Sequence, residues 1–146
     1  MVLAATVNGM PLVYSGQEAG LNRSLKFFDK DVIEWHKHPF EALYAKLFAL
    51  KHNNQALWNG SYGGEMIRIF NDKPEQVISF SRTKGHNRVV LVLNYSNQAA
   101  KVTLHPKHQK GDYVDYFSNT TSKLTAETTL DLAPWSYKIF VANFIK

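Results

Sequence analysis

The sequence contains no cysteine among its 146 residues, which excludes disulfide bridges, thiolate metal ligands and cysteine nucleophiles. It also lacks a continuous apolar run of about 18 residues, so we expect no membrane-spanning segment and no membrane partner. Residues 1–7 lack the positively charged start of a signal peptide. Because cysteine-free chains occur in every compartment, the sequence assigns no localisation.

A concentrated patch of one charge sign is also missing. The 17 lysines and arginines exceed the 12 acidic residues and give a formal net charge of +5. These cations are spread from Arg23 to Lys146, whereas surfaces that bind nucleic acid usually gather cations on one face. We therefore expect no nucleic-acid partner.

Apolar and aromatic residues are plentiful. The sequence is 45% hydrophobic and 13% aromatic, which is enough for the core of an ordinary domain. This aromatic content suits a β-rich core, and it equally suits a surface that stacks on sugar rings or bases. Composition alone does not choose between the two.

The periodicity of the sequence changes in the glycine-rich and asparagine-rich stretch 58–64, which predicts one unit at 1–58 and a second at 59–146. In the first unit, the apolar run 11–15 predicts a buried strand of a parallel sheet. Residues 21–35 predict an irregular loop whose aromatic residues pack it against the protein. From residue 39 onward, apolar residues recur at helical spacing, which predicts an amphipathic helix that ends at residues 52–54.

The second unit alternates with a period of two, which predicts short β-strands separated by turn residues. Residues 89–93 are apolar on both faces, which indicates a central strand. A series of short strands with tight turns is typical of an antiparallel β-sandwich, so we expect a mainly β fold. The predicted strands are 65–70, 77–84, 88–95, 99–104, 112–117, 128–132 and 136–142.

Residues 6–20 resemble the segment of α-amylase-family glycoside hydrolases that ends the seventh helix and forms the eighth strand of the (β/α)8 barrel. The family pattern is approximately G-x-P-x-I/V-Y-x-G-x-E-x-G. Residues 80–82 and 90–96 look like the paired strands of the family's C-terminal sandwich. The fixed positions of the barrel pattern are met by Gly9, Pro11, Tyr14, Gly16, Glu18 and Gly20.

This resemblance implies the last strand, loop and helix of a truncated barrel, followed by a β-sandwich of the amylase C-terminal type. The family cleaves α-glucosidic bonds of starch-like glucans with retention, using carboxylates on the fourth, fifth and seventh strands. The resemblance places all of these before Met1. We therefore expect a structural, inactive C-terminal fragment with no catalytic residue and no cofactor, whose partner is the rest of the barrel.

One carboxylate, Glu18, comes directly after the predicted strand, where barrel enzymes place their chemistry. With Tyr14 and Gln17, it is expected to be a substrate-proximal or supporting residue in the intact enzyme. The alternative is a buried structural carboxylate that forms hydrogen bonds with neighbouring loops. Retaining hydrolysis requires two carboxylates, so Glu18 alone cannot perform it.

A second hypothesis is a stand-alone carbohydrate-binding module, with α-glucan as its partner. Aromatic rings stack on sugar rings, although strand aromatics more often pack in a core. Two histidine pairs, at residues 36 and 38 and at 105 and 108, lack an adjacent third ligand, so we expect no metal site. The candidate stacking residues are Tyr113, Tyr116, Trp135 and Tyr137.

The predicted strand 11–15 has no parallel neighbour within this sequence to pair with. Its backbone groups and apolar side chains therefore need another partner. We expect the first 35 residues to rearrange, to pack on the sandwich, or to exchange with a second copy in a homodimer.

Overall fold

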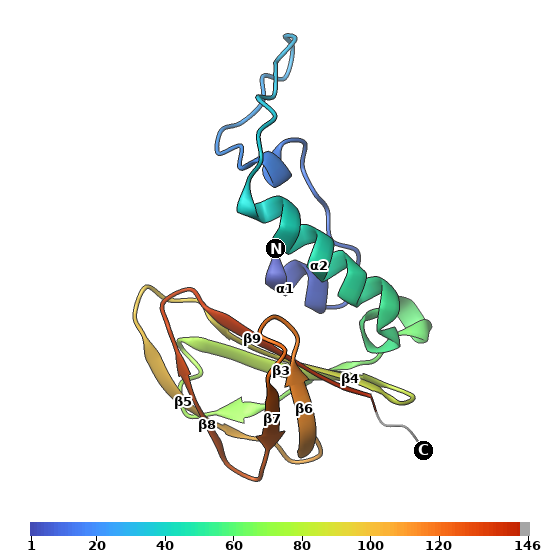
Figure 1. The fold of residues 1–146 in the computed structure, drawn as a ribbon, viewed down its shortest axis with the longest axis vertical. Helices are drawn as coiled ribbons and strands as arrows, with labels where there is room; N and C mark the ends of the chain where they lie inside the picture. The colour runs from blue at the N-terminus through green and yellow to red at the C-terminus, as the bar shows by residue number, and fades with distance from the viewer. Residues whose placement is uncertain (144–146) are drawn as a thin grey trace.

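Residues 1–143, which the computed structural model describes, form two antiparallel β-sheets covered on one side by a helical layer (Figure 1). The larger sheet has the strand order β1-β3-β4-β9-β6-β7, and the smaller sheet has the order β2-β5-β8. The expected mainly β sandwich is thereby confirmed. The strands are β1 (Met66–Arg68), β2 (Phe70–Asn71), β3 (Val77–Lys84), β4 (Asn87–Asn94), β5 (Ala100–His105), β6 (Gly111–Asp115), β7 (Thr121–Leu124), β8 (Thr128–Leu132) and β9 (Tyr137–Asn143).

Strand β4 lies between β3 and β9 in the larger sheet, as the apolar run 89–93 predicts. Its side chains pack alternately into two different hydrophobic cores. Val90 and Val92 pack into the core between the sheets, whereas Val89 and Leu91 pack into a second core beneath the helices. The strand is apolar on both faces because neither face meets solvent.

Two strand predictions need correction. The predicted strand 65–70 is two strands, because the chain crosses at Ile69 from β1 in the larger sheet to β2 in the smaller one. Strand β7 was not predicted at all. Its four residues, TSKL, include a single buried side chain, Leu124, so they carry no alternating pattern.

The helical layer contains α1 (Val2–Thr6), η1 (Gln17–Ala19), α2 (Pro39–Asn53), η2 (Gln55–Leu57) and η3 (Gly60–Tyr62). Helix α2 begins where predicted, because Pro39 fits the first helical turn and the His38 Nδ1 accepts a hydrogen bond from the Phe40 amide over 3.2 Å. Its buried residues Tyr44, Leu47 and Leu50 lie on one face. Figure 1 shows this layer above the larger sheet.

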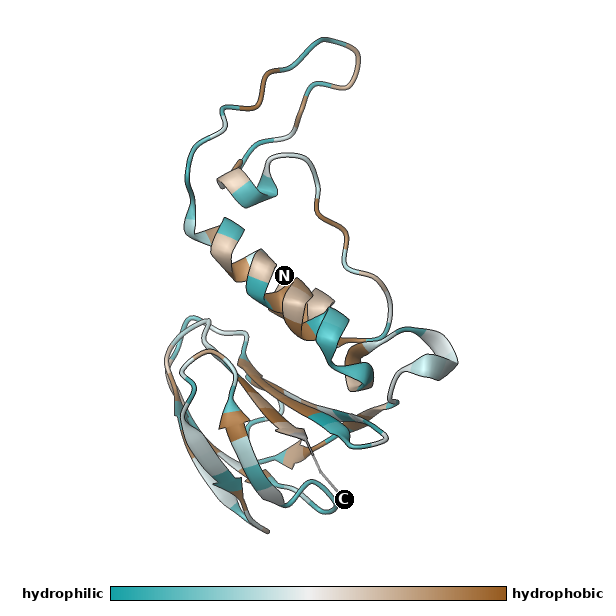
Figure 2. Ribbon diagram, turned by 45° about the vertical axis from the view of Figure 1, so that its right-hand side comes forward, coloured by the Kyte–Doolittle hydropathy of each residue, from teal (hydrophilic) through white to brown (hydrophobic). Residues whose placement is uncertain are grey.

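The predicted strand 11–15 is wrong, because these residues form no β-ladder. They run beside α2 without a strand partner (Figures 1 and 2). The loop 21–35 was also expected to pack against the protein, but it projects away from it. Phe27 and Phe28 at its tip are 91% and 95% exposed, and they contact mainly each other, with ring centroids 4.9 Å apart.

The two layers are joined by the buried side chain of Arg82 on β3. Its guanidinium donates hydrogen bonds to backbone carbonyls of the helical layer and of the residues that lead from it to β1, and it forms no ion pair among residues 1–143. The acceptors are the carbonyl oxygens of Thr6, Val7, Leu57, Trp58 and Gly64.

Candidate functional site

Glu18 lies in the short helix η1, which is bounded by glycines in the left-handed conformation. Gly16 has a φ of 91° and Gly20 has a φ of 78°. A Cβ atom at Gly20 would come within 2.6 Å of the His38 ring. Glycine therefore allows η1 to approach the start of α2 closely, which is what positions Glu18 against that helix.

The Glu18 carboxylate has an unusual environment. Its Oε2 atom is buried and has no hydrogen-bond partner among residues 1–143. Burial raises the pKa of Tyr44, and the charge of Glu18 raises it further, so the carboxylate acts on the buried face of α2. Within residues 1–143 no donor reaches this oxygen, so these residues do not supply the hydrogen bond that the alternative of a structural carboxylate expects here.

A groove of about 560 Å³ opens beside Glu18, and we call it the Glu18 groove. It contains a second carboxylate, Glu41, which comes from the first turn of α2. The sequence did not indicate Glu41, because only folding brings α2 against η1. The groove is lined by Glu18, Ala19, Trp35, His36, Lys37 and Glu41.

The other two predicted supporting residues do not line this groove. Gln17 accepts a hydrogen bond from the Tyr14 backbone amide over 2.9 Å, which closes the turn before η1. The Tyr14 ring is half exposed. Tyr14 and Gln17 thus contact each other in the turn before η1, and they do not line the Glu18 groove.

The four aromatic residues proposed for sugar stacking have different surroundings. Tyr113 is 2% exposed, and its hydroxyl donates to the Gln109 carbonyl over 2.6 Å, so its ring face is not available to a sugar. Tyr116 and Tyr137 pack edge-on against Phe117, and the Tyr116 hydroxyl donates to the Lys46 carbonyl of α2. The exposed Trp135 lies in the turn before β9.

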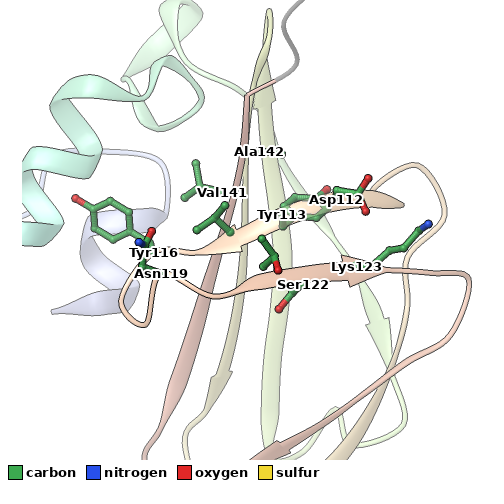
Figure 3. A pocket seen from close by; sticks show the side chains of 10 residues that line it. Asp112, Tyr113, Tyr116, Asn119, Ser122, Lys123, Val141 and Ala142 are labelled. Carbon is green, nitrogen blue, oxygen red and sulfur yellow. The ribbon is translucent and has the colours of Figure 1, made fainter.

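A second groove, of about 870 Å³, lies over β6, β7 and β9. Figure 3 shows Tyr116 at one end of it, with Asp112 and Lys123 toward the other. Because Tyr113 is buried and Tyr116 is bound to α2, this groove presents no free pair of aromatic rings. A sugar platform on the sandwich is therefore not favoured by this arrangement.

The histidine pairs were examined as possible metal ligands. His36 and His38 lie with ring centroids 6.2 Å apart, and His105 lies 3.9 Å from Glu127. Within residues 1–143, no group of three or more histidine, aspartate and glutamate side chains could hold a metal ion. In the same part of the chain, every helix is too short or too polar to cross a membrane.

The sequence was compared with models of protein families and with curated proteins. The family model described as Maltogenic Amylase, C-terminal domain matches residues 67–139. A search of curated proteins returned no match.

Solved structures similar to this chain include the maltogenic α-amylase AmyB from Thermotoga neapolitana, with 24% identity and a TM-score of 0.81. That alignment covers 99% of this chain and 35% of AmyB. An Anoxybacillus α-amylase has 19% identity and a TM-score of 0.73, with 99% and 31% covered. A cyclomaltodextrinase has 18% identity and a TM-score of 0.81, with 97% and 24% covered.

The chain thus spans about a third or less of the length of these proteins, and it shares their fold over almost all of its own length. The family match covers half of the sequence and coincides with the sandwich. The chain belongs to the maltogenic amylase C-terminal domain family.

Proposed function

We propose that this chain is the C-terminal part of an α-amylase-type glycoside hydrolase that acts on α-glucosidic bonds of starch-like glucans. In this proposal, residues 1–58 complete a barrel, residues 59–146 form the sandwich that supports it, and the chain alone does not turn over substrate. The family match carries the proposal, and the alignment of almost the whole chain with about a third of an amylase supports it.

The exposed apolar surface of the helical layer supports the proposal that the rest of a barrel packs against it. Met10, Leu12 and Val32 are each more than 60% exposed, although all three are apolar. Figure 2 shows apolar stretches in the segment between α1 and α2, away from the sandwich. Exposed apolar residues in such number typically mark an interface, and here the rest of a barrel would cover them.

The Glu18 groove also fits a place beside the rest of a barrel, where Glu18 would support the substrate site. A buried carboxylate oxygen without a donor is costly, so a donor outside residues 1–143 would stabilise it. In a complete barrel, the ends of neighbouring strands surround this position. Glu18 would then help to shape the substrate site with Tyr14 and Gln17, and it would not itself perform the chemistry.

The two carboxylates of the Glu18 groove do not form a retaining pair by themselves. Such a pair is held about 5–5.5 Å apart on either side of the sugar. Within residues 1–143, neither Glu18 nor Glu41 has a hydrogen-bond or ion-pair partner that fixes its side chain. Without fixed geometry, the barrier to glycoside cleavage is not lowered enough for turnover.

The test is an assay of the 146-residue chain on soluble starch, maltooligosaccharides and an aryl α-glucoside. We expect no release of reducing sugar or of the aryl group. The matched variants are Glu18→Gln and Glu41→Gln, which remove one carboxylate each with little change in shape. Turnover by the unmodified chain that either variant abolishes would refute the proposed inactivity.

A further inference from the structure

The turn that follows β6 contacts the middle of α2. The Tyr116 hydroxyl donates a hydrogen bond to the Lys46 carbonyl over 3.1 Å, and the Lys46 ammonium lies 5.6 Å from the centroid of the Phe117 ring. Arg82, in contrast, bonds carbonyl groups of residues that lie outside α2. The turn therefore adds a polar contact within the helix to the contacts that Arg82 makes beyond its ends.

Three aromatic rings meet at this turn, and we call them the aromatic clamp. Phe117 contacts both of the others edge-on, with ring centroids 5.6 Å from Tyr116 and 5.2 Å from Tyr137. All three residues are partly buried and pack against the core beneath the helices. Figure 3 shows the Tyr116 ring on the side of the helical layer. The position of Phe117 therefore affects the whole clamp.

The carboxylate of Asp115 holds Phe117 in place. Asp115 is 3% exposed. Its Oδ1 accepts hydrogen bonds from the backbone amides of Phe117 over 3.0 Å and of Ser118 over 3.3 Å. Its Oδ2 accepts a hydrogen bond from the Lys138 ammonium of β9 over 3.0 Å. The carboxylate thus ties the turn to β9 and orients the clamp.

All three groups that bond the Asp115 carboxylate are hydrogen-bond donors. A neutral carboxyl group carries a proton on one of its oxygens and is itself a donor there. On Oδ2 this proton would meet the Lys138 ammonium, and on Oδ1 it would meet the two backbone amides. The neutral form therefore fits this turn less well than the ionised form.

Charged groups of both neighbouring elements face the turn. Lys138 of β9 forms an ion pair with Asp115, and Lys46 of α2 lies over the Phe117 ring. Among residues 1–143, neither lysine forms an ion pair with another carboxylate. Burial raises the pKa of Tyr137, and the charge of Asp115 raises it further. Protonation of Asp115 would leave two ammonium groups beside the clamp without the carboxylate that offsets them.

We propose that Asp115 is an acid-sensitive latch between the sandwich and α2. A proton from solvent binds one oxygen of the Asp115 carboxylate, the ion pair with Lys138 breaks, and the turn releases the aromatic clamp from α2 while both sheets stay folded. Lys138 keeps its own proton, so the step takes up one proton in all. If α2 is the last helix of a barrel, which rests on the proposed function, the latch makes the support of that barrel depend on pH.

The direction of the pKa shift sets the pH range in which the latch opens. Burial alone would raise the pKa of Asp115, but the hydrogen bonds from Lys138 and from the two amides lower it below 3.8. The closed turn therefore binds the proton more weakly than the open turn, in which the carboxyl group has its ordinary pKa. The latch is closed above about pH 5 and opens as the pH falls through 3.8.

Hydrogen exchange of the ¹⁵N-labelled chain, followed by NMR, tests the latch. Protection factors of the α2 amides should fall by about tenfold between about pH 6 and about pH 2.5, the effect of losing one charged hydrogen bond. In acid, the α2 amides should also be at least about tenfold less protected than those of β4. Low concentrations of urea should accelerate exchange in β4 but not in α2, because a local opening exposes little surface.

Two matched variants separate Asp115 from other carboxylates. In Asp115→Asn, which cannot ionise, the α2 amides should already show the lower protection at about pH 6, with less than about threefold further change in acid. The control is Asp31→Asn. Asp31 pairs with Arg23 in the loop before α2, and the hydrogen bond from Arg23 lowers its pKa as well. Because this loop lies outside the turn, Asp31→Asn should keep the full acid response.

Equal protection and equal urea dependence of α2 and β4 in acid would overturn the inference, because the opening would then be global unfolding. A full acid response in Asp115→Asn would overturn it too. If that variant fails to fold, Tyr116→Phe decides. It removes only the hydroxyl that bonds Lys46, and it should lower α2 protection about threefold or more at about pH 6 while β4 stays unchanged. Unchanged protection of α2 would refute the clamp. None of these outcomes bears on the proposed inactivity, which turnover alone decides.

Discussion

The backbone carbonyl of Trp58 lies 2.6 Å from Nη2 of Arg82, which is 24 residues further along the sequence. Trp58 follows η2 at the edge of the helical layer, and Arg82 lies in β3 of the sandwich. The guanidinium is buried and binds only carbonyl oxygens. This contact therefore helps to set how the helical layer sits on the larger sheet.

Replacing Arg82 with methionine should destabilise the chain strongly. Methionine fills much of the volume but leaves buried carbonyl oxygens without donors, and this costs about 3–5 kcal/mol in the free energy of unfolding. Urea denaturation followed by circular dichroism measures the change. The control is Lys84→Met on the same strand, whose exposed ammonium donates to the Ser61 carbonyl over 2.8 Å. Its cost should stay below about 1 kcal/mol, and equal costs for the two variants would contradict the assigned role of Arg82.

Gly63 is required by the same contact. A Cβ atom there would lie 1.8 Å from the Trp58 oxygen and 2.8 Å from Nη2 of Arg82. Gly63→Ala should therefore cost about 3 kcal/mol, because the backbone at Trp58 has to move away from Arg82. Gly60→Ala is the matched control. Gly60 has a φ of 57° but open space around it, so alanine should cost only about 1 kcal/mol, from backbone strain. Thermal unfolding of both variants tests the difference.

Burial periodicity explains which elements the sequence could predict. Helix α2 and strand β4 were found because their apolar residues follow the faces that they bury. In β6 the pattern misleads, because Asp115 is buried while Val114 is partly exposed. Tyr113, a candidate stacking residue, is buried on the same strand, since sequence alone does not say which face of β6 meets the core.

The segment 11–15 and the Glu18 groove depend on contacts between distant parts of the chain, which a local sequence pattern does not show. The apolar run 11–15 indicates residues that are buried in a complete fold, but a strand needs a neighbour to pair with, and residues 1–143 supply none. The sequence pattern also gives no sign of Glu41, because only folding brings α2 against η1. The Glu18 groove was therefore only partly predictable, through Glu18 and its motif.

Asp115 should make the stability of the chain depend on pH. Burial alone would raise the pKa of its carboxyl, but hydrogen bonds from Lys138 and from the Ser118 and Phe117 amides lower it below the usual 3.8. The carboxylate is therefore more acidic in the folded state than in the unfolded state. Its stabilisation is complete above about pH 5, and it declines as the pH falls through 3.8 toward the lower folded pKa.

The substitution Asp115→Asn should remove this pH dependence and cost about 1–2 kcal/mol at pH 7, because the charged bond with Lys138 is lost. Urea denaturation at a series of pH values between 3 and 7 measures both effects. Asp112→Asn, at an exposed position of the same strand, should change stability by less than about 0.5 kcal/mol at every pH. If Asp115→Asn kept the acid sensitivity of the unmodified chain, another carboxylate would be responsible.

The isolated chain should self-associate through the exposed apolar segment that precedes α2. Leu12 is 77% exposed there, and burying one leucine stabilises a complex by about 1.5–3 kcal/mol. In a two-fold dimer each substitution acts twice, so Leu12→Asp should weaken association by about 100-fold or more. Light scattering over a range of protein concentrations measures this. Trp135→Ala removes a side chain of the sandwich that is 66% exposed, and it should leave the association unchanged, because that residue lies outside the segment. A chain that stays monomeric at every concentration would show instead that these residues remain in contact with solvent when the rest of a barrel is absent.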